Sequence, residues 1–486
     1  MSGRRWRTLT GERWERRAAA AVDVSTMFSE EVRRAHASCG SESAAFLGFV
    51  ARNLECLERA PFRVLDQKTA FIHYPLDSWP LFVGPAALGQ MERASVGLSR
   101  LVQLVPRRIF DADERRLAEF YRLSEREALL ATGLLQSGGD EMGLLSRGDF
   151  IFSAAGFQCL EFNFVSNLGG WQSVRWADAY LGMPLIARFL EEERIAASCR
   201  NTLRTLFVHV VERTLRRGGR EVNLAFLLDK NDPGSALLRE YAGKELHAVL
   251  EEMDRTPGQL VVATYDDLVE RGGRLWCDGT RIDVVVEGRA GGISSAVFRC
   301  LMTGSIQVFN GPLAGILTTK RNLAALSEHQ DSPRFSEEER TLIRQHVPWT
   351  RTVDRRSTLY AGETLPLPDL LLRERERFVL KEENSAGGKD VHLGRLTDPE
   401  SWRSLVEKAL TGGTWIVQEY VESLPFVNQR GERGSAIHDV VWGLFAFGDR
   451  YGGCFLRTLP RDAAGIVNAA QGARGCVAFE VGKGMS

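Results

Sequence analysis

The sequence lacks the features that mark membrane, disulfide-rich and zinc proteins. No uninterrupted run of about 18 apolar residues occurs in the 486 residues, so no membrane span is expected. The basic N-terminus has no apolar segment behind it and does not resemble a secretory signal. The 8 cysteines are scattered without a Cys-x-x-Cys pair, which disfavours a zinc site of the usual spacing and a disulfide framework. We therefore expect a soluble, cytoplasmic protein.

The charge is balanced, with 62 Lys+Arg against 63 Asp+Glu. With 44% apolar residues, this balance excludes a disordered chain and a globally basic nucleic-acid-binding protein. Residues 1–17 are locally rich in arginine, and we interpret them as a solvated arm. Nucleic-acid binding through this arm is the alternative, and it would show a steep salt dependence.

At about 150 residues per domain, the length predicts two or three domains. We divide the chain into an arm and helical region (1–140), a hairpin with core helices (141–220), a βαβ domain (221–300) and a strand-rich region (301–486). Residues 221–288 alternate strand and helix patterns, which predicts a parallel sheet. No Gly-x-Gly-x-x-Gly follows the first strand, so the dinucleotide fingerprint is absent.

The most informative segment runs from Ser146 to Phe164. We interpret residues 154–156 as a three-residue hairpin loop, with Gly156 in the left-handed conformation that such loops need. Strand alternation then gives the hairpin a core face and a polar face. The core face is predicted to carry Phe150, Phe152, Leu160, Phe162 and Phe164.

In this register Asp149 faces Glu161 and Arg147 faces Asn163, all on the polar face. Two opposed carboxylates repel and need a positive partner. Two carboxylates and an amide oxygen are hard ligands suited to Mg²⁺ that is also held by phosphates. Arg147 would contact a phosphate or a developing oxyanion. The alternative is a surface hairpin with a mixed polar face, and a loop of two or four residues would shift the pairing by one.

A second candidate region reads as strand, glycine loop and strand between residues 378 and 394. Lys381 ends the first strand and can neutralise a phosphate, while Ser385, Gly387 and Gly388 can bring backbone N–H groups close to an anion. The loop is not Gly-x-x-x-x-Gly-Lys-Ser/Thr, so a P-loop NTPase is excluded. The alternative is an ordinary exposed hairpin.

Three weaker signals complete the set of candidate residues. Lys320 begins an amphipathic helix, and Arg457 lies on a late strand where it could clamp a phosphate. An apolar strand ends in Gln418, Glu419 and Tyr420, which could serve an adenine. Each signal alone fits a solvated helix face or a half-buried strand equally well.

Taken together, these motifs resemble the circularly permuted ATP-grasp ligases, specifically the glutathionylspermidine synthase-like group, from about Ser146 to Gly472. The most specific part is Arg-x-Asp followed twelve positions later by Glu-x-Asn. The resemblance implies an α+β / α/β ATP-grasp fold with an N-terminal helical region and an inserted Rossmann-like βαβ domain. The metal residues precede both lysines, which is the permuted order. There is no separate amidase domain, and the substrate regions do not match.

The resemblance also implies roles for the individual residues. Asp149, Glu161 and Asn163 would hold Mg²⁺, Arg147 would stabilise the transferring group, and Arg457 would contact a phosphate. Lys320, Lys381, Ser385, Gly387, Gly388, Gln418, Glu419 and Tyr420 would bind ATP. The reaction would join a small-molecule or peptide carboxylate to an amine through an acyl phosphate, without nucleic acid or membrane.

Two other functions remain as alternatives. One is a phosphotransferase that stops at a phosphorylated product, and the other is a catalytically silent regulator that binds ATP–Mg²⁺. The N-terminal helical region either covers the substrate entrance or forms a homodimer contact. The acid and the amine are left open.

Overall fold

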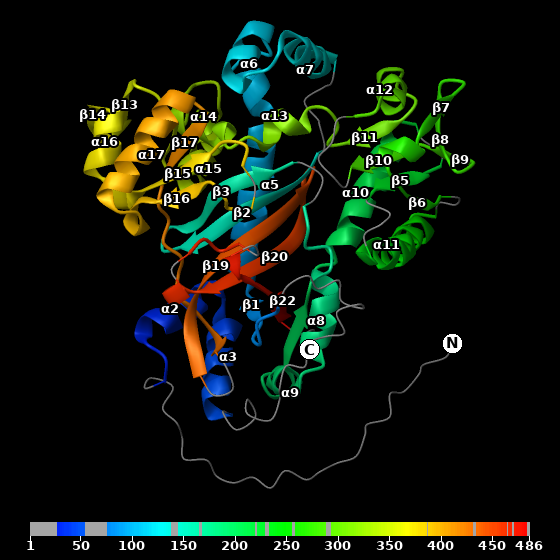
Figure 1. Ribbon diagram of the computed structural model, residues 1–486. Helices are drawn as coiled ribbons and strands as arrows, with labels where there is room; N and C mark the ends of the chain where they lie inside the picture. Colours follow the sequence, from blue (N-terminus) through cyan, green and yellow to red (C-terminus); the bar gives the residue numbers. More distant parts are fainter. Residues whose placement is uncertain are drawn as a thin grey trace, which may run out of the picture.

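The computed structural model describes most of the chain in a mixed α and β fold (Figure 1). The described residues are 27–53, 75–137, 144–164, 168–218, 221–228, 233–254, 258–287, 293–385, 387–430, 434–463, 465–468 and 471–483. The arginine-rich arm therefore lies outside the described residues. No helix in these ranges is both long and apolar enough to cross a membrane.

The centre of the molecule is an antiparallel sheet in which the early hairpin meets strands from the end of the chain. Its order is β21-β20-β19-β2-β3, and β18 also pairs with β19. The pairing of β2 with β19 places Asp149 opposite Gly443. The strands are β2 (Leu145–Ser153), β3 (Gly156–Asn163), β18 (Phe426–Arg430), β19 (Gly434–Phe447), β20 (Arg450–Pro460) and β21 (Arg474–Cys476).

One face of this sheet is closed by the long helix α5 (Pro85–Arg108), which passes behind the sheet in Figure 1. The helix buries an apolar stripe against the aromatic face of the hairpin. Phe150, Phe152, Phe162 and Phe164 lie in this core, as predicted, and the buried Cys159 lies with them. Because α5 occupies this face, the polar residues of the hairpin lie on the opposite face of the sheet.

The predicted three-residue loop of the hairpin is wrong, although the pairing expected at its open end is confirmed. Ser153 pairs with Gly156, so the turn has two residues, and Gly156 has the expected positive φ of 96°. A β-bulge between Asp149 and Phe150 then shifts the register by one. Asp149 consequently faces Glu161, and Arg147 faces Asn163.

The bulge also corrects the prediction for one side chain. Leu160 is the extra residue of the bulge, and it was expected in the core. It is half-buried instead and lines a cavity beside Glu161. The bulge therefore brings two consecutive residues of β3 to the same side of the sheet.

A smaller lobe, yellow and orange in Figure 1, contains an antiparallel sheet of order β12-β17-β15-β16. Its strands match the runs predicted around residues 378–394 and 415–420. The core of the lobe is a separate apolar cluster that includes Trp402 and Phe378. Its elements are β12 (Thr350–Thr352), β13 (Ser357–Tyr360), β14 (Glu363–Pro366), α16 (Leu367–Arg373), β15 (Phe378–Glu382), β16 (Val391–Leu393), α17 (Pro399–Gly412) and β17 (Trp415–Glu419). The two helices that lead into the lobe pack against α5 in the central core, and they are α14 (Arg321–Glu328) and α15 (Glu337–His346).

A third lobe, green in Figure 1, contains the predicted parallel sheet, in the order β11-β10-β5-β6. The sheet extends to β11 (Gln307–Phe309), past the boundary that we set at residue 300. Asn310 follows β11 and hydrogen-bonds the backbone of Leu145 and Phe164, which joins the lobe to the central hairpin. The other elements are α10 (Thr202–Arg216), β5 (Leu224–Leu227), α11 (Pro233–Glu252), β6 (Leu260–Ala263), β7 (Val269–Arg271), β8 (Arg274–Cys277), β9 (Thr280–Ile282), β10 (Val284–Glu287) and α12 (Ser295–Met302).

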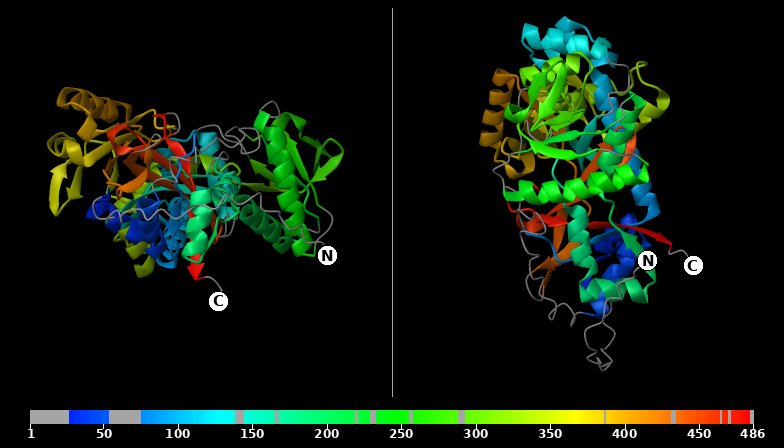
Figure 2. Two further views of the ribbon diagram at one scale, coloured as in Figure 1. Left: turned by 90° about the horizontal axis from the view of Figure 1, so that it is seen from below. Right: turned by 90° about the vertical axis from the view of Figure 1, so that its right-hand side faces the viewer.

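The remaining elements surround the central sheet, and Figure 2 shows the two lobes on either side of this body. The elements are α2 (Glu30–Cys39), α3 (Ser41–Arg52), β1 (Leu81–Val83), α6 (Glu114–Tyr121), α7 (Glu125–Ser137), α8 (Ser173–Leu181), α9 (Pro184–Glu192), β4 (Ile195–Ser198), α13 (Ala314–Thr318) and β22 (Ala478–Lys483). Arg122 separates α6 from α7, because its left-handed backbone ends α6.

Candidate functional site

A cavity of about 150 Å³ between the central sheet and the smaller lobe gathers most of the predicted residues. Ten of the thirteen candidates line it, from five separate segments of the chain. They are Asp149, Glu161, Lys320, Lys381, Ser385, Gly388, Gln418, Glu419, Tyr420 and Arg457. Arg147, Asn163 and Gly387 are not part of the lining.

On the central sheet, the carboxylate of Asp149 is held by two arginines. Arg147 Nε is 2.9 Å from Oδ1, and Arg457 Nη2 is 2.7 Å from Oδ2. Burial alone would raise the pKa of Asp149, but the two guanidinium charges outweigh it and lower the pKa to about 2. Arg147 also donates to the carbonyl of Leu168, so it lies behind Asp149 rather than in the cavity wall.

Glu161 has a looser environment than Asp149. Its side chain is 32% exposed, and Lys320 Nζ is 3.3 Å from its Oε2. Lys320 itself is buried just before α14 and donates to the carbonyl of Ser385 at 2.7 Å. One cation therefore links the hairpin to the loop that follows β15.

On the smaller sheet, Lys381 is buried against neutral oxygens. Its Nζ donates to Gln418 Oε1 at 2.6 Å and to the carbonyl of Leu160 at 3.2 Å. Burial lowers the pKa of Lys381 to about 8, although Glu161 partly offsets this effect. Gln418 Nε2 donates to Thr350 Oγ1 at 3.1 Å, so both ends of this amide are used by the protein. Gln418 therefore positions Lys381 in this structure.

The end of β17 forms the far wall of the cavity. Tyr360 donates its hydroxyl to Glu419 Oε1 at 2.8 Å, and burial raises the pKa of that phenol. The guanidinium of Arg395 lies 4.5 Å from the centre of the Tyr420 ring. Aromatic and charged contacts therefore fix both side chains at the edge of the cavity.

The glycine loop after β15 has the backbone that the sequence suggested. Gly387 and Gly388 have φ of 73° and 70°, which side-chain-bearing residues rarely adopt. A Cβ on Gly388 would lie 3.3 Å from Ile466, whereas one on Gly387 would meet nothing within 4 Å. The Ser385 hydroxyl is buried without a hydrogen-bond partner among the described residues. The loop thus presents a buried donor to the cavity.

Several lining residues were outside the predicted set. Asp439 and Ser423 lie on the wall beside Arg457, and Asp439 is 2.8 Å from Arg461. Gly465, Ile466, Val467 and Asn468 close the side next to the glycine loop. In the sequence, Asn468 offers an amide oxygen and Asp439 a carboxylate, and neither belongs to a motif. Strand alternation places Asp439 and Val441 on the same face, but this is informative only when β19 is known to pair with β2.

The donors available for a metal are two carboxylates and one amide. Asp149 and Glu161 are directly opposed in register, and Asn163 lies two pairs further along, opposite Arg147. Within the described ranges, no group of three or more His, Cys, Asp or Glu side chains forms a metal cluster. An ion here would therefore need oxygen ligands from a second molecule, which is how Mg²⁺ is usually held with phosphates.

The fold has a match among solved structures, although the sequence has none among family models or curated proteins. A solved structure of a glutathione synthetase-like effector from Globodera pallida matches the fold with a TM-score of 0.53 and 12% sequence identity. The match covers 84% of this chain and 91% of that one. The chain therefore shares a mixed α+β fold with a glutathione synthetase-like protein.

Proposed function

We propose that the chain is an ATP- and Mg²⁺-dependent carboxylate–amine ligase with a circularly permuted ATP-grasp fold. The observation that carries this proposal is the meeting of ten candidate residues, from five distant segments, in one cavity. The glutathione synthetase-like fold of the structural neighbour supports it independently. The order of the segments also fits a permutation, because the hairpin carrying Asp149 precedes both lysines.

The cavity offers the three kinds of contact that a nucleoside triphosphate needs. Lys320 and Lys381 provide positive charge for phosphates. The glycine loop and the unpartnered hydroxyl of Ser385 provide donors without steric hindrance. The edge of β17 provides polar contacts for the base and the ribose, with Glu419 and Tyr420 already oriented by their neighbours.

The donor set fits Mg²⁺ with one rearrangement. Both oxygens of Asp149 are engaged by arginines, so this carboxylate has to exchange at least one guanidinium before it can hold an ion. Glu161 is the more open ligand, and Asn163 donates only a long 3.4 Å hydrogen bond from its Nδ2. When bound, the ion would neutralise phosphate charge. The exchange would release a guanidinium of Arg457 or Arg147 toward the transferring group.

The proposed ligase reaction has two steps, and the charges of the cavity suit both. A substrate carboxylate attacks the γ-phosphorus of ATP, the bond to ADP breaks, and an acyl phosphate forms. An amine then attacks the acyl carbon, inorganic phosphate leaves, and the amine loses a proton to give the amide. The chain positions these groups and offsets phosphate charge with lysines. Arg457 stabilises the tetrahedral oxyanion, and Arg147 joins it once Asp149 has exchanged that guanidinium for the ion.

One observation favours a second candidate, a catalytically silent ATP-binding regulator. Asp149 is satisfied by two arginines, as expected for a structural ion pair that never exchanges. The matching structure is described as an effector, which is a role that need not include catalysis. A phosphotransferase is the third possibility, and it would release ADP without needing an amine.

An ADP-release screen distinguishes the three functions. Candidate acids are tested against amino acids, peptides and polyamines, with Mg²⁺–ATP present. A ligase releases ADP fully only with a matching acid and amine, and product mass spectrometry detects the amide. ADP release with the acid alone and a stable phosphorylated product would indicate a phosphotransferase. ATP binding without ADP release for any pair would indicate the regulator.

A further inference from the structure

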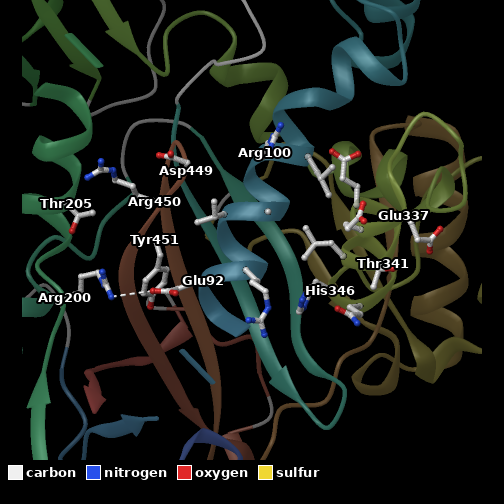
Figure 3. A pocket seen from close by; sticks show the side chains of 18 of the residues that line it. Glu92, Arg100, Arg200, Thr205, Glu337, Thr341, His346, Asp449, Arg450 and Tyr451 are labelled. Carbon is white, nitrogen blue, oxygen red and sulfur yellow. Dashed lines mark ion pairs between the residues drawn. The ribbon is translucent and has the colours of Figure 1, made fainter. Parts of the chain in front are cut away.

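The largest hollow of those described is separate from the candidate site, on the side of the central sheet covered by α5. It has a volume of about 1170 Å³ and lies between α10 and α15, with α5 as its floor and the β19–β20 turn at one end (Figure 3). The hollow is open along α5, so a segment of polypeptide has room to lie between its two walls.

The charges in this groove are arranged asymmetrically across its width. The floor, the α10 wall and the turn contribute five arginines and two acids, whereas the α15 wall contributes three glutamates and no lysine or arginine. Figure 3 shows Arg200 and Arg450 on one side and Glu337 on the other. The five arginines are Arg93, Arg100, Arg200, Arg204 and Arg450, and the glutamates are Glu337, Glu338 and Glu339.

The charged side chains of the two walls are held in place by partners outside the groove. Arg450 is 2.7 Å from Glu212, and Arg200 is 2.9 Å from Glu480. On the opposite wall, Glu339 is 2.5 Å from Arg108. These pairs order the walls, and fixed charges at a rim orient a partner more than they add affinity.

The floor is different, because its two cations lack such partners. Arg93 and Arg100 are exposed, and neither forms an ion pair within the part of the chain that the structure describes. They are seven residues apart on α5, so they lie on one face about 10 Å apart along the axis. Val96 lies between them, and Val208 and Leu342 add apolar contacts from the walls. The floor is thus a short apolar seam with a guanidinium near each end.

We infer that this groove binds an amphipathic helix of a partner protein, with an apolar seam, an acidic flank toward α5 and α10, and a basic flank toward α15. A helix laid in a groove uses apolar anchors at helical spacing, which matches the floor between Arg93 and Arg100. The glutamate wall disfavours a nucleic acid or an anionic membrane, since both would bring negative charge against it. Arg93 and Arg100, which form no ion pair among the described residues, therefore favour acidic residues on the flank of the helix that faces them. The charges of the walls are already paired and serve to orient the helix.

The walls of the groove are continuous with elements that carry candidate site residues. Gln158 of β3 donates to the carbonyl of Gln345 at 2.6 Å, and His346 contacts the carbonyl of Phe157 at 2.7 Å. Glu161 lies on the same strand as Phe157 and Gln158. A helix that moves α15 would therefore act directly on the strand that lines the cavity.

The test uses a labelled synthetic helix with a leucine seam, glutamates on one flank and lysines on the other, measured by fluorescence anisotropy at low ionic strength. The control peptide has the same composition but mixed charges on both flanks. Exchanging the two flanks is no control, because a helix can enter the groove in either direction. We expect saturable binding of the patterned peptide and at least about tenfold weaker binding of the mixed one.

Matched variants locate the binding surface. Arg93→Glu with Arg100→Glu should weaken the patterned peptide at least about tenfold and should favour a peptide with lysines on both flanks. Arg271→Glu with Arg274→Glu, on the distant exposed hairpin β7–β8, should leave binding unchanged. Absence of saturable binding, equal binding of both peptides, or insensitivity to the α5 variants would each overturn the inference. None of these readouts depends on ATP chemistry.

Discussion

The two sides of the cavity handle buried charge in opposite ways. On the central sheet, Asp149 is matched by the charges of Arg147 and Arg457, at 2.9 Å and 2.7 Å. On the smaller sheet, Lys381 is matched only by the neutral oxygens of Gln418 and Leu160. The carboxylate and the lysine are both almost completely buried, so their different environments result from their partners.

The pKa values express this difference. The arginines overcome the effect of burial and lower the pKa of Asp149 to about 2, whereas burial dominates at Lys381 and lowers its pKa to about 8. The first arrangement stabilises the fold at neutral pH, and the second destabilises it. A buried cation whose hydrogen bonds all go to neutral oxygens, and whose burial Glu161 offsets only in part, marks a candidate functional site. The smaller sheet is therefore the side that a phosphate would complete.

The largest expected effect is on Glu161, which is held by only one cation. Glu161→Ala should abolish ATP turnover while leaving the fold intact, because the most open of the proposed metal ligands is lost and little packing depends on it. Turnover is measured by ADP release, and the fold by circular dichroism. The exposed Glu422, which does not line the cavity, provides the matched control Glu422→Ala. Wild-type-like turnover in Glu161→Ala would remove the metal assignment.

Removing the charge of Asp149 tests the central sheet, where the buried charge is paired with opposite charges. Asp149→Asn leaves two buried guanidiniums without their carboxylate, and we expect the free energy of unfolding to fall by about 3–5 kcal/mol. Because the pKa is lowered in the folded state, the stabilisation is present above pH 3.8 and is lost as the pH falls toward 2. Urea unfolding at several pH values measures both effects. An unchanged stability, or the same acid dependence in Asp149→Asn, would contradict the account.

Arg147 should affect the rate more than nucleotide binding. Arg147→Ala should reduce turnover by about 10²–10³-fold, as loss of an oxyanion donor typically does. Arg147→Lys keeps the charge but lacks the planar fork, so it should recover only part of the rate. Steady-state kinetics with a matched acid and amine separate kcat from KM. An unchanged rate would assign Arg147 to structure alone.

Lys381 should show the reverse of the effect at Asp149. Its folded pKa lies below the ordinary value of 10.5, so the cost of burying the charge is present below about pH 8 and disappears as the pH rises toward 10.5. In Lys381→Met the cost of burying the charge, about 3 kcal/mol at pH 7, is removed, but two hydrogen bonds to Gln418 and Leu160 are lost as well. The pH dependence is therefore the readout: urea unfolding without nucleotide should show stability rising from pH 8 to 10.5 in the wild type and a flatter profile in Lys381→Met. The same rise in both proteins would contradict the comparison.

Local patterns in the sequence predicted much of the fold and most of the candidate residues. The parallel sheet, the hairpin and the strand ending at Glu419 each carry a clear apolar pattern over a short segment. The residue types at the cavity also have recognisable chemistry, which is why ten of the thirteen candidates line it.

The remaining features depend on contacts between distant segments. The bulge at Leu160 depends on how β3 fits its neighbours. We expected a third loop residue to bring Asp149 opposite Glu161, and the bulge produces this pairing instead. Asp439 lines the cavity because β19 pairs with β2, which no local pattern indicates. Gln418 has a polar side chain of the kind that contacts nucleotides, yet its amide hydrogen-bonds Lys381 and Thr350. The groove behind the sheet combines three helices and leaves no local signature.

The central claim is that these residues form one ATP site, and equilibrium binding of Mg²⁺–ATP by isothermal titration calorimetry tests it most directly. The account predicts one saturable site per chain, at least about tenfold weaker in Lys381→Met and unchanged in the Arg271→Glu, Arg274→Glu control. Absence of binding, or wild-type affinity in Lys381→Met, would contradict it.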